Sequence, residues 1–175
     1  MSEKRIAWAI TGGGHTLEEC INTILNYERV DVFLSRAAED VLGMYSLDAR
    51  ITVPKIRVYQ ETKPSTPVVA RLFGGTYSVL VVAPATSNSV AKFVHGISDT
   101  LVTNLFAQAG KSRIPVIVYP TDLLPSANSP GPRGRIIKVY PRPVDLENTA
   151  KLRSFGGVTV VSNREELEQS LITFV

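Results

Sequence analysis

The segment that most constrains the fold spans residues 77–104, YSVLVVAPATSNSVAKFVHGISDTLVTN. It opens with an apolar, β-branched run bounded by Pro84, and such a run predicts a buried strand. Because proline fixes φ and lacks a backbone donor, we expect the chain to leave the sheet at Pro84. The polar cluster Thr86-Ser87-Asn88 then lies where a parallel strand ends and a helix begins. That edge of an open α/β sheet is where ligands bind.

A glycine-rich turn follows another predicted strand near the amino terminus. Residues 4–10, KRIAWAI, are typical of a strand, and Thr11-Gly12-Gly13-Gly14-His15-Thr16 precedes a segment with helical spacing from Leu17. Glycines allow close approach to a ligand, and the helix start favours an anion. The turn has neither the Gly-Lys-Ser/Thr of a Walker A loop nor a G-x-G-x-x-G fingerprint. It indicates a phosphate site, and a glycine turn without a ligand stays open as the alternative.

Further strand and helix signals predict the fold class. Val30–Leu34 forms a second strand, and Ser35 is placed as the N-cap of the next helix, at the same sheet edge as the glycine turn. Capping alone and ligand contact are equal alternatives for Ser35. With a helix over 99–109 and a strand over 114–119, strands and helices alternate four times. This predicts an α/β, Rossmann-like (flavodoxin-like) doubly wound parallel sheet in three α/β/α layers.

The rest of the chain yields shorter elements and one long loop. In chain order these are extended pieces within 51–65, a short helix at 68–73, a Pro/Gly/Ser/Asn-rich loop over 120–135, a strand at 136–140, a helix at 145–155, a strand at 158–161 and a helix at 165–172. A loop of that length belongs to the functional or disordered class. No repeat or linker divides the chain, so a single domain over residues 1–175 is expected.

Composition narrows the class of site. The single cysteine, Cys20, excludes an internal disulfide and a cysteine-only metal or iron–sulfur site, and it fits a small core residue. No second ligand is spaced with His15, so no metal is predicted. No apolar run approaches the roughly 18–20 residues of a membrane span, and a net charge of +3 is too weak to predict nucleic-acid binding. A reducing cytoplasm is the simplest setting.

Three motifs arrive in order at one sheet edge: TGGGHT, VFLSRAA and VVAPATSNSVAKFVHGISDTLVTN. Together they resemble the FMN-binding flavoprotein family that includes the homo-oligomeric flavin-containing cysteine decarboxylases. PATSNS is similar to that family's P-A-S-A-N-T motif, and HGISDTLVT to its G-x-x-D-x-L segment. The resemblance covers roughly residues 4–122. It implies FMN as the cofactor, a Rossmann-like fold, and assembly as a trimer or a multiple of trimers.

The resemblance also implies a set of cofactor-binding residues. The glycine turn would surround the phosphate, Ser35 would reach the phosphate or ribityl chain, and the central motifs would line the flavin ring. The residues so placed are Gly12, Gly13, Gly14, His15, Thr16, Ser35, Pro84, Ala85, Thr86, Ser87, Asn88, Ser98, Asp99 and Leu101. Helix capping remains open for Asn88 and Asp99.

Two departures from the decarboxylases shape the expected function. Their Met-rich P-x-M-N-x-x-M-W clamp is replaced by Pro120–Pro125, PTDLLP, and residues 36–76 contain no histidine for their catalytic position. The chain looks more like archaeal-type flavoproteins that transfer electrons from a ferredoxin-like donor. The alternatives are a dihydromethanopterin reductase with a pterin substrate, an enzyme like phosphopantothenoylcysteine decarboxylase or the flavin prenyltransferases, and a non-catalytic ligand-binding module.

Other polar residues carry weaker signals. Arg133, Arg135, Lys138 and Arg142 form a basic group after the long loop, which fits either a solvated edge strand or a docking surface for an acidic electron donor. His95, in the last turn before Gly96, fits the negative end of a helix dipole better than catalysis. His15 fits a cap or surface position as well as a contact with the flavin phosphate or a substrate.

Overall fold

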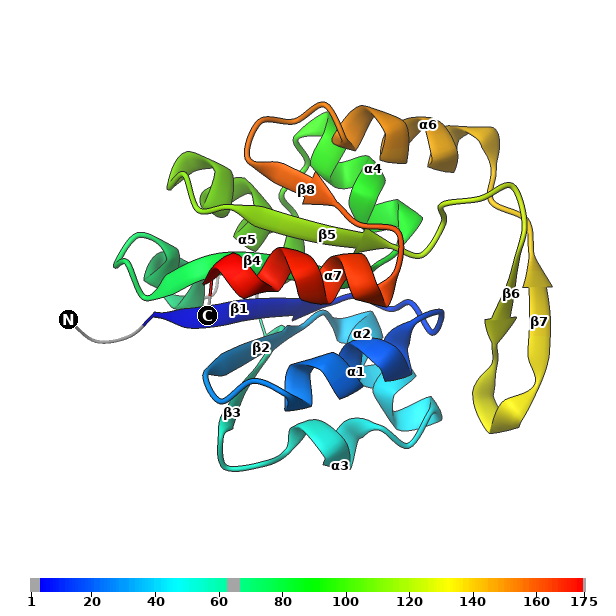
Figure 1. Cartoon of the computed structure of the whole chain (residues 1–175), viewed down its shortest axis with the longest axis horizontal. Coiled ribbons are helices and arrows are strands. Elements are labelled where there is room, and N and C mark those ends of the chain that lie inside the picture. Colours follow the sequence, from blue (N-terminus) through cyan, green and yellow to red (C-terminus); the bar gives the residue numbers. More distant parts are fainter. Residues whose placement is uncertain (1–3, 63–66, 175) are drawn as a thin grey trace.

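A parallel six-stranded sheet forms the centre of the protein (Figure 1). The computed structural model describes residues 4–62 and 67–174. The sheet order is β3-β2-β1-β4-β5-β8, which reverses direction between β1 and β4. Its strands are β1 (Arg5–Ile10), β2 (Val30–Leu34), β3 (Ile56–Gln60), β4 (Tyr77–Ala85), β5 (Val116–Pro120) and β8 (Val158–Val160). This is the strand order of the Rossmann fold, and its switch point lies between β1 and β4.

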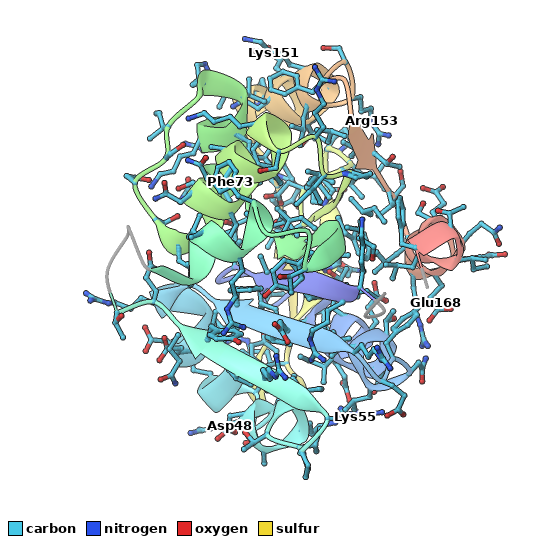
Figure 2. The ribbon with its side chains drawn as sticks, turned by 90° about the vertical axis from the view of Figure 1, so that its left-hand side faces the viewer. Asp48, Lys55, Phe73, Lys151, Arg153 and Glu168 are labelled. Carbon is cyan, nitrogen blue, oxygen red and sulfur yellow. The ribbon has the colours of Figure 1, made fainter. Side chains whose placement is uncertain are left out.

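Helices cover both faces of the sheet and complete the predicted three layers. The helices are α1 (Leu17–Leu25), α2 (Arg36–Met44), α3 (Asp48–Ile51), α4 (Ser87–His95), α5 (Leu101–Lys111), α6 (Pro143–Leu152) and α7 (Arg164–Leu171), with 3-10 turns η1 (Pro67–Leu72), η2 (Pro132–Gly134) and η3 (Ile172–Phe174). Buried residues of α1, α2, α3 and α7 share one core, and those of α4, α5 and α6 share the other. Figure 2 looks at the molecule from its left side in Figure 1, with Asp48, Lys151 and Glu168 at the periphery.

Side-chain alternation along β1 feeds both cores. Ile6, Trp8 and Ile10 enter one core, whereas Ala7 and Ala9 enter the other. Trp8 is fully buried, and its indole Nε1 donates to the Ala83 carbonyl oxygen at 2.7 Å. Trp8 is therefore a core residue, as a buried indole with a satisfied N–H predicts.

Cys20 is also a core residue, as predicted. Its side chain is fully buried on α1, and burial raises the pKa of its thiol. A thiol held protonated in apolar surroundings is a poor nucleophile.

The end of β4 differs from the expectation drawn from Pro84. The strand continues to Ala85, with a register shift between Val82 and Ala85. Proline removes only a donor, and the Pro84 carbonyl oxygen still accepts from Thr11 N at 3.2 Å and from Thr11 Oγ1 at 2.8 Å. The strand therefore stays attached to its neighbour through that oxygen.

Residues 120–135 are not simply the loop that their composition predicts. They include β6 (Ala127–Pro130), which pairs antiparallel with β7 (Ile136–Val139) in a hairpin. The hairpin projects beyond the edge of the sheet at which β5 and β8 end (Figure 1). Tyr45 Oη donates to the Pro130 carbonyl oxygen at 2.7 Å and holds it to the body. The sequence ANSP is poor in strand-forming residues, which is why composition alone missed β6.

Asp145 fixes the start of α6 by binding its own cap residue. Asp145 Oδ2 accepts from Arg142 N at 2.9 Å, and Oδ1 accepts from Arg142 Nη2 at 2.7 Å. These hydrogen bonds with Arg142 lower the pKa of the Asp145 carboxyl. A lowered folded-state pKa adds stability above the unfolded pKa of about 3.9, and that stability is lost as pH falls through the folded value.

We therefore expect Asp145→Asn to lower the free energy of unfolding by about 0.5–2 kcal/mol at pH 7, which is the usual effect of losing a cap. The difference from the wild type should shrink below about pH 4, where both chains carry a neutral group. Urea unfolding at pH 7 and pH 3 measures both values. An equal loss at the two pH values would contradict a role for the charge.

Candidate functional site

The strand ends β1, β2 and β4 bring the predicted motifs to one edge of the sheet. A cavity of about 400 Å³ lies there, and four of the predicted residues, Gly12, Ser35, Thr86 and Asn88, line it. Thr11, Asp40, Glu61, Lys92 and Thr100 line it too. The cavity thus joins residues from the ends of four strands and the starts of three helices, α2, α4 and α5.

Thr11 ties the ends of β1 and β4 together beside this cavity. Its hydroxyl donates to the Pro84 carbonyl oxygen at 2.8 Å and accepts from Thr86 N at 2.8 Å. Thr11 is almost fully buried, so these bonds form in a region of weak screening. The hydroxyl thereby fixes where α4 begins relative to the glycine turn.

Two glycines of the turn are required by close packing. A Cβ at Gly12 would lie 2.7 Å from Ala37 Cβ, and one at Gly13 would lie 2.7 Å from Thr121 Cγ2. Real Cβ atoms essentially never approach another atom so closely. The turn therefore touches α2 on one side and the end of β5 on the other, as the sequence predicted for a close-approach turn.

Ser35 caps α2. Its Oγ accepts from Ala38 N at 3.1 Å, which is the bond that an N-cap serine makes. The capping alternative for Ser35 is thus present in the structure, and Ser35 also lines the cavity. Contact between Ser35 and a ligand stays a prediction.

Asn88 lies in the first turn of α4 and is exposed to the cavity. Within residues 4–62 and 67–174 its side chain makes no hydrogen bond. The N-cap of α4 is Thr86, whose side chain bonds Ser89 Oγ instead of a backbone N–H. The first N–H groups of a helix have no partner inside it, so α4 offers both donors and a free amide at this edge.

Pro84, Ala85 and Ser87 support the site rather than line the cavity. Pro84 and Ala85 are buried at the end of β4. The Ser87 hydroxyl donates to Asp122 Oδ2, and Thr121 Oγ1 donates to the same oxygen at 3.1 Å. Asp122 therefore joins the start of α4 to the segment that follows β5.

The other part of the glycine turn faces a second cavity. Gly14, His15 and Thr16 line a hollow of about 700 Å³, whose far wall is Pro130, Gly131, Arg133 and Gly134 of the hairpin segment. Among the described residues, His15 Nδ1 and Thr16 Oγ1 are buried atoms without a hydrogen-bond partner. The predicted residues are thus divided between two cavities on either side of the turn.

The segment 98–101 is only partly in place. Ser98 and Asp99 are exposed and do not line the smaller cavity, and Asp99 pairs with Lys92 at 2.8 Å. Thr100, not Asp99, is the N-cap of α5. The Leu101 side chain lies in the core, yet its backbone N–H faces the site and donates to Glu61 Oε1 at 2.6 Å.

The other histidine and the basic group are placed at the surface. His95 is exposed in the last turn of α4, with Nδ1 2.8 Å from the Ala91 carbonyl oxygen. Arg133, Arg135 and Lys138 are exposed on the hairpin segment. Arg142 instead binds Asp145 and is committed to α6.

Comparison with known proteins decides the family. A family model described as Flavoprotein matches residues 1–172. The chain belongs to the Flavoprotein family. The expected family placement and α/β fold are therefore confirmed.

Relatives of this flavoprotein include one reductase and one structure with a flavin. An uncharacterized protein of Methanocaldococcus jannaschii is 33% identical over 98% of this chain and 96% of its own length. A dihydromethanopterin reductase (acceptor) of Methanosarcina mazei is 40% identical over 83% of this chain, but the match spans 62% of that protein. The structure of Burkholderia xenovorans DmrB in complex with FMN, described as a cubic protein cage for redox transfer, has 38% identity and a TM-score of 0.87 over 98% of this chain and 95% of that one.

Several residues at the edge of this flavoprotein's sheet were not predicted from sequence. Glu61 is the main one, because it follows β3 in a segment where only short extended pieces were expected. The rule that ligand sites lie after parallel strands could have marked it once β3 was accepted as a sheet strand. In the part of the chain that the structure describes, no group of three or more His, Cys, Asp or Glu could hold a metal ion, and no helix is long and apolar enough to cross a membrane.

Ser35 and Asn88 allow folding and binding roles to be separated. We expect Ser35→Ala to lower the free energy of unfolding of the flavin-free protein by about 1 kcal/mol, since it loses a capping bond. Asn88→Ala should change it by less than about 0.5 kcal/mol and should weaken flavin binding. Urea unfolding and flavin titration of both variants give the four values. A stability loss in Asn88→Ala with unchanged flavin affinity would assign Asn88 to folding.

Proposed function

We propose that this flavoprotein is an FMN-dependent oxidoreductase that passes electrons from a reduced donor to a pterin-type acceptor. The chain is a flavoprotein with FMN as its cofactor. The observation that carries the proposal is the cavity at the β1, β2 and β4 ends, where the predicted phosphate turn, Ser35 and the PATSNS segment meet. The Methanosarcina mazei reductase and the FMN-bound Burkholderia xenovorans structure support the same reaction class.

The residues present fit FMN. The glycine turn packs without room for a Cβ at Gly12 or Gly13, so its backbone is open to a ligand without an intervening side chain. Buried His15 Nδ1 and Thr16 Oγ1 lack partners among the described residues, and polar atoms in that state are expected to meet a ligand or water. The helix starts of α2, α4 and α5 favour a phosphate.

Each part of the chain then has a role toward the cofactor. The N–H groups of the glycine turn and Ser35 would hold the phosphate and ribityl chain, and Thr86 and Asn88 would face the ring. Bound FMN supplies hydride or single-electron transfer, and the protein supplies orientation and electrostatics. Thr11 and Asp122 keep the ends of β1, β4 and β5 in register, so these groups stay preorganised.

A decarboxylase is less well supported. Its Met-rich clamp would stand at residues 120–125, where this chain places Asp122 between Ser87 and Thr121 as a structural tie. A module that binds FMN without catalysis differs by showing no turnover. Reduced-donor oxidation in the presence of a dihydropterin separates these functions, and a flavin that is reduced but never reoxidised by a pterin would overturn the acceptor we propose.

We further propose that the exposed cations of the hairpin segment dock an acidic, ferredoxin-like donor. Arg133 and Arg135 lie beside the larger cavity, so a donor bound there would approach the glycine turn. Arg133→Glu with Arg135→Glu should slow flavin reduction by reduced ferredoxin about fivefold or more at low ionic strength, because charge steers the encounter. The effect should fade with salt.

The control changes two exposed lysines elsewhere, Lys111 and Lys151, to Glu and should leave the rate near the wild-type value. Stopped-flow reduction at two salt concentrations measures both double variants. Equal slowing by the two would reduce the effect to net charge and contradict a defined docking surface.

The assembly belongs to the proposal as well. The Burkholderia xenovorans relative is described as a cubic cage, and the family resemblance implies trimers or multiples of trimers. Ile136 and Tyr140 are 63% and 69% exposed, which fits burial against another copy. Light scattering of the holoprotein tests this, and a monomer at micromolar concentration would contradict it.

A further inference from the structure

The carboxylate of Glu61 joins the starts of two helices. Oε2 accepts from Arg36 N at 3.0 Å at the start of α2, and Oε1 accepts from Leu101 N at 2.6 Å at the start of α5. The first N–H groups of a helix lack partners inside it and lie at the positive end of its dipole. Two such helix starts therefore converge on one point, and an anion of the chain itself fills that point.

The same point belongs to the cavity assigned above to the cofactor. Glu61 lines it together with Gly12, Ser35 and Asn88. A phosphate monoester carries about −1.5 to −2 charges at pH 7 and three acceptor oxygens, whereas a carboxylate carries one charge and two oxygens. Because the cavity holds only about 400 Å³, both anions in it would repel each other strongly.

We propose that Glu61 is an internal competitor of the FMN phosphate. Its carboxylate occupies the N–H groups of Arg36 and Leu101 in the flavin-free protein, and the incoming phosphate takes its place. The inference rests on the proposed use of FMN. It makes the charge of Glu61 a determinant of FMN affinity, and the affinity for riboflavin, which has no phosphate, should not depend on that charge.

The test compares FMN and riboflavin binding to the wild type and to Glu61→Gln. The amide keeps the size of the side chain and one acceptor oxygen, so it removes mainly the charge. We expect Glu61→Gln to bind FMN about fivefold or more tightly, and riboflavin within about twofold of the wild type. The matched control is Glu39→Gln, which removes the same charge from the first turn of α2 outside the cavity and should change neither affinity.

Fluorescence titration of the flavin-free proteins gives these affinities, and amide NMR gives a second readout. FMN, but not riboflavin, should move the amide signals of Arg36 and Leu101 in the wild type. Unchanged or weaker FMN binding by Glu61→Gln would overturn the competitor role, as would equal tightening of riboflavin or unmoved amide signals. If the wild type and both variants all failed to bind FMN, the proposed function itself would be overturned together with this inference.

Discussion

Gly12→Ala is expected to weaken FMN binding about thirtyfold. The new Cβ would lie 2.7 Å from Ala37 Cβ, and neither of these short side chains can turn away. The glycine turn must therefore move away from α2, which separates the turn from Ser35 across the cavity. Overpacking of this kind has an energetic cost of about 1–3 kcal/mol, and 2 kcal/mol corresponds to about thirtyfold in affinity.

Gly43→Ala provides the matched control on the neighbouring helix. A Cβ at Gly43 meets nothing within 4 Å, and the residue lies inside α2. Alanine is the better helix former by up to about 1 kcal/mol, so this variant should gain stability and keep its FMN affinity. Flavin titration and urea unfolding of both variants separate the two sites. Full FMN affinity in Gly12→Ala would remove the glycine turn from the binding site.

Asp31→Ala is expected to lower the free energy of unfolding by about 3–5 kcal/mol, the loss typical of breaking a buried ion pair. Asp31 is fully buried on β2. Its Oδ1 accepts from Arg5 Nε at 2.6 Å, and its Oδ2 accepts from Tyr77 Oη at 2.7 Å. Burial, and then the bond to Asp31, raises the pKa of the Tyr77 phenol, which keeps it a donor. Alanine would leave the Arg5 guanidinium and the Tyr77 hydroxyl without these acceptors.

Asp31→Asn keeps the size of the side chain and should lose less stability, which provides a second variant if Asp31→Ala does not fold. Asp48→Ala, at an exposed position of α3, is the control and should stay within about 0.5 kcal/mol of the wild type. Urea unfolding at pH 7 measures all three. A loss below about 1 kcal/mol in Asp31→Ala would contradict a structural role for the buried pair.

The sheet and its helices could be predicted because their signals are local. The buried strands β1, β2 and β4 are continuous apolar runs, and α1 shows helical spacing that the structure buries at Leu17, Cys20, Ile21 and Ile24. The Ser35 cap was predictable for the same reason, since its partner Ala38 lies three residues away.

The remainder depends on contacts between distant residues. Glu61 meets Arg36 across 25 residues and Leu101 across 40, and no local pattern encodes that convergence. The hairpin was missed because Ala127–Pro130 carries little strand propensity and is held only by β7 and Tyr45. Asp99 resembles a cap in sequence, but Lys92 takes its carboxylate and Thr100 caps α5.

The identity of the ligand released from the purified protein tests the central claim most directly. The protein is denatured, and the released ligand is identified by chromatography and its absorbance spectrum, before and after reconstitution with flavins. The account predicts FMN, bound through the cavity that Gly12, Ser35 and Asn88 line. Release of FAD, or of no flavin even after reconstitution with FMN, would contradict it.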